Sequence, residues 1–387
     1  MAKESTSIWR RIERGILWGL TILASLGLIV ASYGGEVNPA AVKGICLMVM
    51  TFPAWALLML LATLMDLLWC RKALVLCVLV WIACAQPLVN FMPMNILPLR
   101  ESKYAGDPKF TFLTYNVTNF QDLSDSYPDS INPTISYILK VNADVVNLQE
   151  APVVTPNRKF HITPEQVDSL YRAYPYILHY AKDQTLLSKY PAEAIHTPMD
   201  SVAKRGVLAV YRLDIEGTPV TLINVHLQSY GLKPSDKALY REITDLKDPD
   251  GNIKSTLLDV KSELLSKIQA AAVLRAGHTQ RVCNYIERFG GPNVIVAGDF
   301  NDVPGCYALR RLAEYDMKEV WPHVGFGPMI TFHADRFYFR IDHVLYRGAL
   351  EPLRMTRDKV KYSDHYPLLT TFALTSGNDR SDDNSKK

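Results

Sequence analysis

Two kinds of apolar pattern divide the chain. Three long stretches without a charged residue come first, at 16–33, 44–65 and 73–94. Each approaches or exceeds the ~20 apolar residues that a helix needs to cross the ~30 Å hydrocarbon core of a bilayer. Later apolar runs are short and alternate with helical patterns, which is typical of α and β layers around a shared core. The sequence therefore predicts a membrane anchor with three transmembrane helices over 1–104, and an α/β domain over 105–375.

Basic residues flank the three stretches unevenly. Those on the side of the N-terminus are Lys3, Arg10, Arg11, Arg14, Arg71 and Lys72, and those on the other side are Lys43, Arg100 and Lys103. Because basic residues favour the cytoplasmic side, we expect an integral, multi-pass membrane protein with its soluble domain outside the cytoplasm, which is the periplasm in a Gram-negative bacterium. If the third stretch, with its polar Gln86 and Asn90, failed to span, the domain would face the cytoplasm.

Other segments show no catalytic pattern. Residues 229–255 are polar with turn signals and predict a long surface loop. Residues 257–289 have helical periodicity, with an expected break at Gly277 and an end at the glycines that follow. Residues 376–387 predict a disordered tail. Cys283 and Cys306 are expected to be free, buried thiols, although an oxidising compartment would allow a bond between them.

Candidate chemistry appears where apolar runs end. Asp299 and Asn301 directly follow the strand-like run 294–297, where they form either a functional site or a turn that caps the strand. Four further clusters place acid, amide or imidazole groups at the ends of such runs, and this favours a site. These clusters end in Asn116, in Gln149 and Glu150, in Asn224 and His226, and in the pair of segments 340–343 and 363–365.

The residue types in these clusters suit metal-dependent phosphoester hydrolysis. Mg²⁺ prefers oxygen ligands, which Glu150, Asp364 and Asn116 could supply. Hydrolysis also needs groups that position water and stabilise charge on the phosphate. The residues that fit these roles are Asp299, Asn301, His226 and His365. Independently, a carboxylate beside an imidazole fixes its tautomer, which suits Asp342 and His365.

In this order, the clusters resemble the endonuclease/exonuclease/phosphatase superfamily, which includes deoxyribonuclease I, exonuclease III, inositol polyphosphate 5-phosphatases and neutral sphingomyelinases. The resemblance covers residues 106–373. It implies a four-layer α/β sandwich with two packed mixed β-sheets and the active site at one end. The residue roles that it implies are metal binding by Asn116, Glu150 and Asp364, phosphate contact by His226 and Asn301, water alignment by Asp299, and a catalytic His365 oriented by Asp342.

Other polar residues are expected to be structural. His343 follows Asp342 on a strand, so the two side chains point to opposite faces. The histidines without a companion cluster are His161, His179, His196, His278, His323 and His333. Arg205 and Lys189 could reach a phosphate, but we expect them to be solvated strand ends. Residues 184–186 depart from the superfamily, which often has glycine and alanine there.

Three functional classes compete: a membrane-tethered phosphoesterase, a catalytically inactive binding module on the same fold, and a transport subunit. The retained site residues argue against the second, and the absence of charge within the three stretches argues against the third. Residues 105–375 carry 30 Lys and Arg against 31 Asp and Glu, which predicts no basic track for nucleic acid. We therefore expect a Mg²⁺-dependent (or Mn²⁺-dependent) hydrolase of lipid head groups or small phosphodiesters, with a DNA or RNA nuclease as the alternative. No protein partner can be inferred.

Overall fold

The computed structural model describes most of the chain. The described residues are 2–96, 102–121, 131–180, 183–195, 208–231, 253–334 and 338–375. The predicted tail at 376–387, most of the predicted loop at 229–255, and two of the residues considered above, His196 and Arg205, lie outside them.

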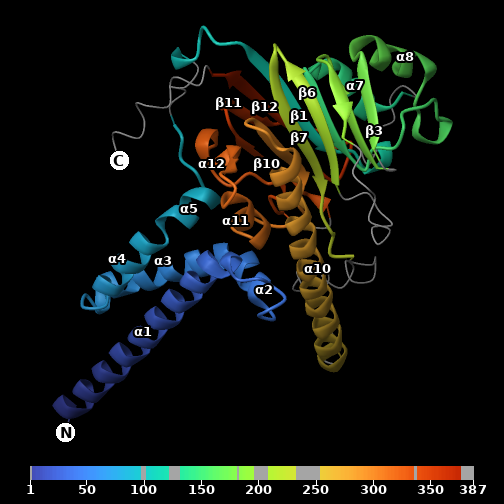
Figure 1. Ribbon diagram of the computed structural model, residues 1–387. Coiled ribbons are helices and arrows are strands. Elements are labelled where there is room, and N and C mark those ends of the chain that lie inside the picture. Colours follow the sequence, from blue (N-terminus) through green and yellow to red (C-terminus); the bar gives the residue numbers. More distant parts are fainter. Residues whose placement is uncertain are drawn as a thin grey trace.

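The domain contains two mixed six-stranded sheets (Figure 1). The first has the order β11-β12-β1-β2-β4-β3, and its strands are β1 Lys109–Asn116, β2 Val145–Gln149, β3 Tyr176–Tyr180, β4 Gln184–Ser188, β11 Leu350–Arg357 and β12 Leu368–Leu374. The second has the order β5-β6-β7-β8-β10-β9, and its strands are β5 Ala192–Ala194, β6 Leu208–Ile215, β7 Thr218–His226, β8 Val294–Asp299, β9 Lys318–Glu319 and β10 Asp342–Arg347.

Three apolar clusters define four layers. The central cluster joins the facing sides of the two sheets and includes Phe112 of the first and Leu222 of the second. Another packs the outer side of the first sheet against α7 (Pro133–Val141) and α8 (Pro164–Ala173). The third packs the outer side of the second sheet against α10 (Ile253–Phe289) and α11 (Tyr307–Ala313). The predicted four-layer α/β sandwich is confirmed.

Helix α10 spans Ile253–Phe289 without interruption, and α11 spans Tyr307–Ala313. The expected break at Gly277 is therefore wrong, since a single glycine costs a helix only ~1 kcal/mol. The helix ends before Gly290, as predicted. The short helices of the domain are α12 Val320–Val324, η2 Thr118–Phe120 and η3 Arg158–Phe160.

The N-terminal helices α1 to α5 only partly follow the predicted stretches. They are α1 Ala2–Tyr33, η1 Gly34–Glu36, α2 Ile45–Met50, α3 Phe52–Trp69, α4 Leu74–Ala83 and α5 Ala85–Phe91. Within the described residues, two helical segments, Arg11–Glu36 and Phe52–Trp69, are long and apolar enough to cross a membrane. The number is three if α4 and α5, which meet at a bend of 58°, form one span.

Two prolines explain where the predicted second and third stretches differ from the helices. Pro53 lies in the first turn of α3, where its missing N–H breaks no helical bond, so the helix starts at Phe52 and not at residue 44. Pro87 would clash with the carbonyl of Ala83, four residues earlier, in a continuous helix. This is where α4 ends.

Because α3 continues to Trp69, it contains an acidic residue, and the expectation that the helices carry no charged side chain is wrong. Asp66 is fully buried and accepts a hydrogen bond of 2.6 Å from Thr21 of α1. The Cys77 thiol of α4 lies 3.5 Å from the same carboxylate oxygen. Asp66 thus joins three helices of the bundle.

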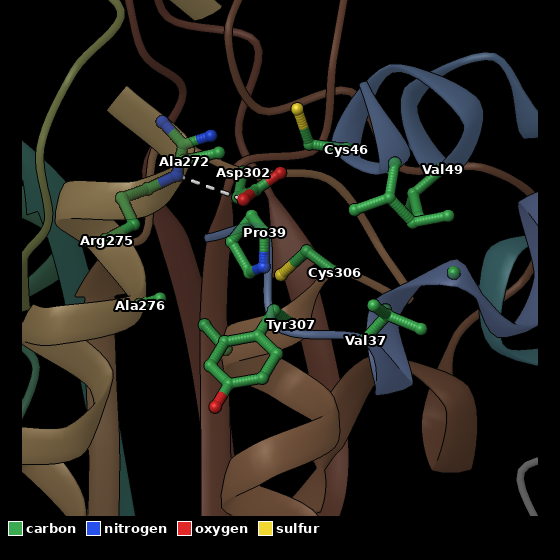
Figure 2. A pocket seen from close by; sticks show the side chains of 14 residues that line it. Val37, Pro39, Cys46, Val49, Ala272, Arg275, Ala276, Asp302, Cys306 and Tyr307 are labelled. Carbon is green, nitrogen blue, oxygen red and sulfur yellow. Dashed lines mark hydrogen bonds and ion pairs between the residues drawn. The ribbon is translucent and has the colours of Figure 1, made fainter. Parts of the chain in front are cut away.

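The N-terminal helices and α10 extend from the same side of the sheets (Figure 1). They meet the domain at a small pocket, where Cys46 and Pro39 lie opposite Arg275 of α10 (Figure 2). Arg275 is 2% exposed, and its Nε donates a 3.0 Å hydrogen bond to Asp302. The guanidinium also stacks on the Tyr230 ring at 4.6 Å. A buried ion pair therefore lies between the N-terminal helices and the sheets.

This ion pair predicts a specific loss of stability. Arg275→Met leaves the Asp302 carboxylate buried without its partner, so the free energy of unfolding should fall by about 3–5 kcal/mol. Arg212→Met is the matched control, because the ion pair of Arg212 with Glu193 is exposed and should contribute only about 0–1 kcal/mol. The measurement is urea unfolding of the full-length protein in detergent micelles. Equal losses in the two variants would contradict a structural role for the buried pair.

Candidate active site

The ends of six strands bring the predicted residues to one edge of the sandwich. Asn116, His226 and Asp299 are the last residues of β1, β7 and β8. The parallel pairs β1·β2 and β7·β8 align these ends, and Glu150 directly follows β2. The remaining residues come from antiparallel strands. β10 begins with Asp342 opposite Asp299, and residues 364 and 365 come shortly before β12.

His365 lies between two carboxylates. Its Nδ1 is 2.8 Å from Asp342 Oδ2, and its Nε2 is 3.6 Å from Asp299 Oδ2. All three side chains are buried. The Phe332 ring packs edge-on against the imidazole at a centroid distance of 5.0 Å, which leaves the ring little room to rotate. The expected pairing of His365 with Asp342 is thus present in the geometry.

The charges in this group shift one another's pKa values. Burial alone would lower the pKa of His365, but Asp342 and Asp299 outweigh it and raise this pKa to about 10. Burial, and next the repulsion from Asp342, raise the pKa of Asp299 above its usual range, against the opposing effect of the two histidines. At neutral pH the imidazole is therefore protonated and can donate an N–H toward a negatively charged oxygen.

Glu150 joins the same group through an amide. Asn116 Nδ2 donates hydrogen bonds of 3.1 Å to both Glu150 Oε1 and Asp299 Oδ2. His226 Nε2 lies 3.7 Å from Glu150 and 3.8 Å from Asp299. Two carboxylates from different sheets are thereby held apart by an amide and an imidazole, which reduces their mutual repulsion.

Asp364 is held on the other side of Asn116. Its Oδ1 accepts a 2.6 Å hydrogen bond from Thr118 and a 3.3 Å bond from Ser363. Burial would raise the pKa of Asp364, but the charge of the nearby His365, together with the hydrogen bonds from Thr118 and Ser363, outweighs it and holds this pKa below its usual range. The carboxylate is therefore charged at neutral pH and oriented by two hydroxyls. Thr118, which lies just beyond the Asn116 cluster, was not among the site residues predicted from the sequence.

Asn301 and Gly298 show why the loop after β8 has its sequence. Asn301 adopts φ +51°, its backbone N–H bonds to Asp299 Oδ1 at 2.8 Å, and its side chain donates to the carbonyl of Leu227. Gly298 has φ +140°, and a Cβ there would lie 2.1 Å from the Val225 carbonyl. The aspartate can therefore reach the edge only because a glycine precedes it.

A buried polar layer supports the site from below, and the sequence analysis did not predict it. Gln149 Nε2 donates a 2.7 Å hydrogen bond across the sheets to Asn224 Oδ1. Asn224 Nδ2 bonds back to the Leu148 carbonyl at 2.9 Å. Gln184, in the segment that departs from the superfamily, contributes to this layer and bonds to the Asn224 carbonyl at 3.3 Å. The signal in the sequence that could have predicted this layer is the occurrence of Asn and Gln within otherwise apolar strands.

Other singled-out residues lie elsewhere. His343 is buried, with its nitrogens 2.7 Å from Glu319 and 3.0 Å from the Asp302 carbonyl, so the prediction that it faces the packed layer is confirmed. Lys189 lies at the opposite edge, beside Asp144. Cys283 and Cys306 are free and buried. Among the other described histidines, His333 contacts a site segment, because its backbone N–H donates a 3.0 Å hydrogen bond to the Asp364 carbonyl. His278 lies within electrostatic range of His226.

The donor set suits a hard divalent cation. In the described part of the chain, Asp299, Asp342 and His365 form a group whose ligand atoms lie within 4.8 Å of one another. The hydrogen bond between the last two already engages one oxygen of Asp342. The Glu150 carboxylate is more exposed than those of Asp299 and Asp342, so a cation from solvent can reach it. Burial disfavours the negative charge on Asp299, and a cation nearby would stabilise that charge. An oxygen-rich, negatively charged edge of this kind is where Mg²⁺ binds through one or two carboxylates and water.

Comparisons with known proteins agree with this geometry. Residues 261–365 match the sequence profile of the Endonuclease/Exonuclease/phosphatase family. No curated protein matches the chain. The resemblance to the superfamily is therefore confirmed by a profile that covers β8, β10 and the Ser-Asp-His segment.

Several solved structures are similar at low identity. An endonuclease/exonuclease/phosphatase from Beutenbergia cavernae DSM 12333 is 17% identical, with 69% of this chain and 72% of that chain covered and a TM-score of 0.45. An AP endonuclease from Archaeoglobus fulgidus is 17% identical, with 67% and 98% covered and a TM-score of 0.43. The D. rerio TDP2 complexed with single strand DNA product is 18% identical, with 69% and 99% covered and a TM-score of 0.41.

The 2.8 Å contact between Asp342 and His365 predicts that the two act as one unit. Asp342→Asn and His365→Ala should each lose most activity, and the double variant should be little worse than His365→Ala, because groups that act together are not additive. The measurement is kcat/KM of the full-length variants on bis-p-nitrophenyl phosphate with Mg²⁺. If the two losses multiplied, the residues would work separately.

Proposed function

We propose that this chain, whose soluble domain resembles the endonuclease/exonuclease/phosphatase superfamily, is a membrane-tethered, Mg²⁺-dependent phosphoric ester hydrolase. Members of that family hydrolyse phosphodiester or phosphomonoester bonds with a divalent metal, and either bond is a candidate for this chain. The observation that carries the proposal is the convergence of Glu150, Asp299 and the Asp342–His365 pair at one edge.

The residues suit distinct roles in hydrolysis. Asp299 accepts one hydrogen bond from the backbone N–H of Asn301 and one from the side chain of Asn116, and it is placed to align a water molecule for attack on phosphorus. His365, protonated and held by Asp342, can donate an N–H to the developing negative charge or to the leaving oxygen. His226 and Asn301 flank Asp299 and are proposed to contact the phosphate.

Glu150, Asp364 and Asn116 are proposed to hold the cation. Such an ion supplies charge neutralisation on the phosphate oxygens. For Asn116 to bind a cation together with Glu150, its amide would have to turn, because its Nδ2 and not its Oδ1 now faces the Glu150 carboxylate. Mn²⁺ accepts the same oxygen-rich ligands as Mg²⁺ and is the alternative.

We also propose that the N-terminal helices cross the membrane and that the domain lies outside the cytoplasm. The start of α1 and the turn between α3 and α4, which carries Arg71 and Lys72, lie at the ends of the helices far from the domain. Basic residues favour the cytoplasmic side. The multi-pass anchor over 1–104, the catalytic domain over 105–375 and its periplasmic location in a Gram-negative cell remain part of this proposal.

The substrate class follows from charge and tethering. The soluble domain is nearly neutral, with 30 basic against 31 acidic residues over 105–375, whereas a nuclease gains most of its affinity from basic contacts to phosphates. A site held beside a bilayer encounters lipid head groups or small phosphodiesters. We favour these over nucleic acid as the substrate. A nuclease and an inactive binding module are the competing outcomes of the tests below.

The metal assignment gives the direct test of hydrolysis. Glu150→Gln should lower turnover of bis-p-nitrophenyl phosphate by several orders of magnitude, because it removes a charged ligand, and the fold should remain as stable. Glu165→Gln, in the exposed first turn of α8, is the matched control and should leave turnover unchanged. Excess EDTA should abolish turnover, and Mg²⁺ or Mn²⁺ should restore it. Full activity of the Glu150 variant, or activity in EDTA, would contradict the assignment.

Salt dependence separates the substrate classes. We expect the full-length protein to release phosphate or head group from mixed phospholipid micelles with little change between ~50 and ~200 mM salt. A nuclease that neutralises several phosphates loses ~10³ or more in affinity over that range. Steeply salt-sensitive cleavage of plasmid DNA, with no product from any lipid, would establish the nuclease alternative. No turnover of any substrate would favour a binding module.

A further inference from the structure

A second cavity lies between the N-terminal helices and the domain, and it shares Val49 of α2 with the pocket of Figure 2. Its volume is about 100 Å³. Residues from both parts of the chain line it, among them Val49, Phe52 and Phe91 from the helices and Val303, Ile330 and Arg340 from the domain. The walls are apolar except for Arg340 and the hydroxyl of Tyr338. Apolar cavities of similar size, ~150 Å³, stay dry and bind small hydrocarbons.

Arg340 is the charged residue of this cavity and has unused donors. Its side chain is 3% exposed. Nη2 donates a 2.6 Å hydrogen bond to the Asn90 carbonyl and lies 3.5 Å from Glu319. Nε and Nη1 are buried and have no hydrogen-bond partner among the described residues. A buried N–H donor without a partner is destabilising. A ligand with an oxygen atom could accept hydrogen bonds from these donors, which a purely apolar ligand could not.

The cavity is lined by residues that lie close in sequence to those of the candidate active site. Val303 lies two residues after Asn301, and Arg340 lies two residues before Asp342. Phe339, another lining residue, pairs with Phe332, whose ring packs against His365. Phe339 and its bridge partner Phe332 therefore connect the wall of the cavity to the imidazole of His365.

The cavity also lies where the N-terminal helices meet the domain. Phe52 is the first residue of α3 and Phe91 the last residue of α5, and their rings are 5.4 Å apart. Large apolar side chains remain exposed at the same junction, where Met94 pairs with Phe326 and the two are 67% and 65% exposed. If the helices span a bilayer, this level is its interface with water.

We propose that the cavity binds the upper part of one hydrocarbon chain of a membrane lipid, that Arg340 donates to an oxygen between that chain and the head group, and that the phosphoester of the same molecule reaches His365. This inference rests on the proposed function and specifies its substrate as an amphiphile taken from the bilayer. It also explains why the helices contribute walls to the cavity beside the site.

The first experiment varies the chain of a phosphodiester. The probes are alkyl p-nitrophenyl phosphates with methyl, butyl, hexyl and dodecyl chains, at concentrations below micelle formation, hydrolysed by the full-length protein with Mg²⁺. Burial of each methylene should raise kcat/KM by roughly threefold to fourfold. The rise should stop once the cavity is filled. A flat response, with the methyl ester hydrolysed normally, would overturn the inference and leave the proposed function intact.

A matched pair of variants tests the location. Val49→Phe fills the cavity from helix α2 and should remove the dependence on chain length, while turnover of the methyl ester stays unchanged. Val42→Phe lies in the same segment but is exposed and does not line the cavity, so it should behave as the wild type. Ile330→Phe fills the cavity from the domain side and replaces Val49→Phe if that variant does not fold. Retained chain-length dependence in the folded filling variant would overturn the inference.

The second experiment does not depend on catalysis. Full-length protein carrying Glu150→Gln is placed in phosphatidylglycerol nanodiscs that contain a phospholipid with a diazirine near the head-group end of one chain, and is irradiated. We expect saturable labelling of lining residues such as Phe52 and Ile330, reduced at least tenfold in Val49→Phe. Labelling confined to the exposed faces of the helices, such as Leu57 and Leu68, would overturn the inference. Labelled lining residues in this variant, together with no hydrolysis of any alkyl ester by the wild-type protein in the first experiment, would instead overturn the proposed function alone.

Discussion

The site depends on a hydrogen bond that crosses from one sheet to the other. Gln149 Nε2 and Asn224 Oδ1, 2.7 Å apart in the buried interior, fix β2 against β7 directly below the edge. A shift of one residue in either strand would point every side chain to the opposite face. It would leave these amides unpaired at a cost of roughly 1–3 kcal/mol each. Glu150 and His226, which follow in these strands, therefore have one relative position.

The same constraint explains how the edge tolerates so many acids. Glu150, Asp299, Asp342 and Asp364 come from four segments that the two sheets bring together. Asn116 donates to the first two, and His365 contacts the second and third. Burial and the remaining repulsion raise the pKa of Asp299, so the arrangement is poised to gain stability from a cation. The fixed positions of the four carboxylates and their excess negative charge both favour binding of a cation.

Two buried arginines also constrain the edge. Arg275 of α10 bonds to Asp302, the residue after Asn301. Arg340, two residues before Asp342, bonds to the carbonyl of Asn90 in α5. The loop after β8 is therefore held by α10, and the start of β10 by the N-terminal helices. The helices do more than attach the domain to a surface, because their ends form part of the environment of the site.

The sequence by itself determined the classes of element and the residue types of the site. Buried β-branched runs that end in Asn116, Gln149, His226 and Asp299 predicted strands with polar ends, because this local pattern needs no knowledge of distant contacts. The four-layer sandwich followed from the resemblance that these motifs carry. The alternation of side chains along β10 correctly predicted that Asp342 and His343 point to opposite faces of the sheet.

Only the tertiary structure decided the contacts between segments distant in sequence. The cross-sheet amides, the pairing of Thr118 with Asp364 and the ion pair of Arg275 with Asp302 join residues 27 to 246 positions apart. Local periodicity carries no information on such pairs. Helix ends were likewise decided by context: Gly277 stayed helical within a packed α10, whereas Pro53 and Pro87 moved the boundaries of α3 and α4 because proline sterics override an apolar pattern.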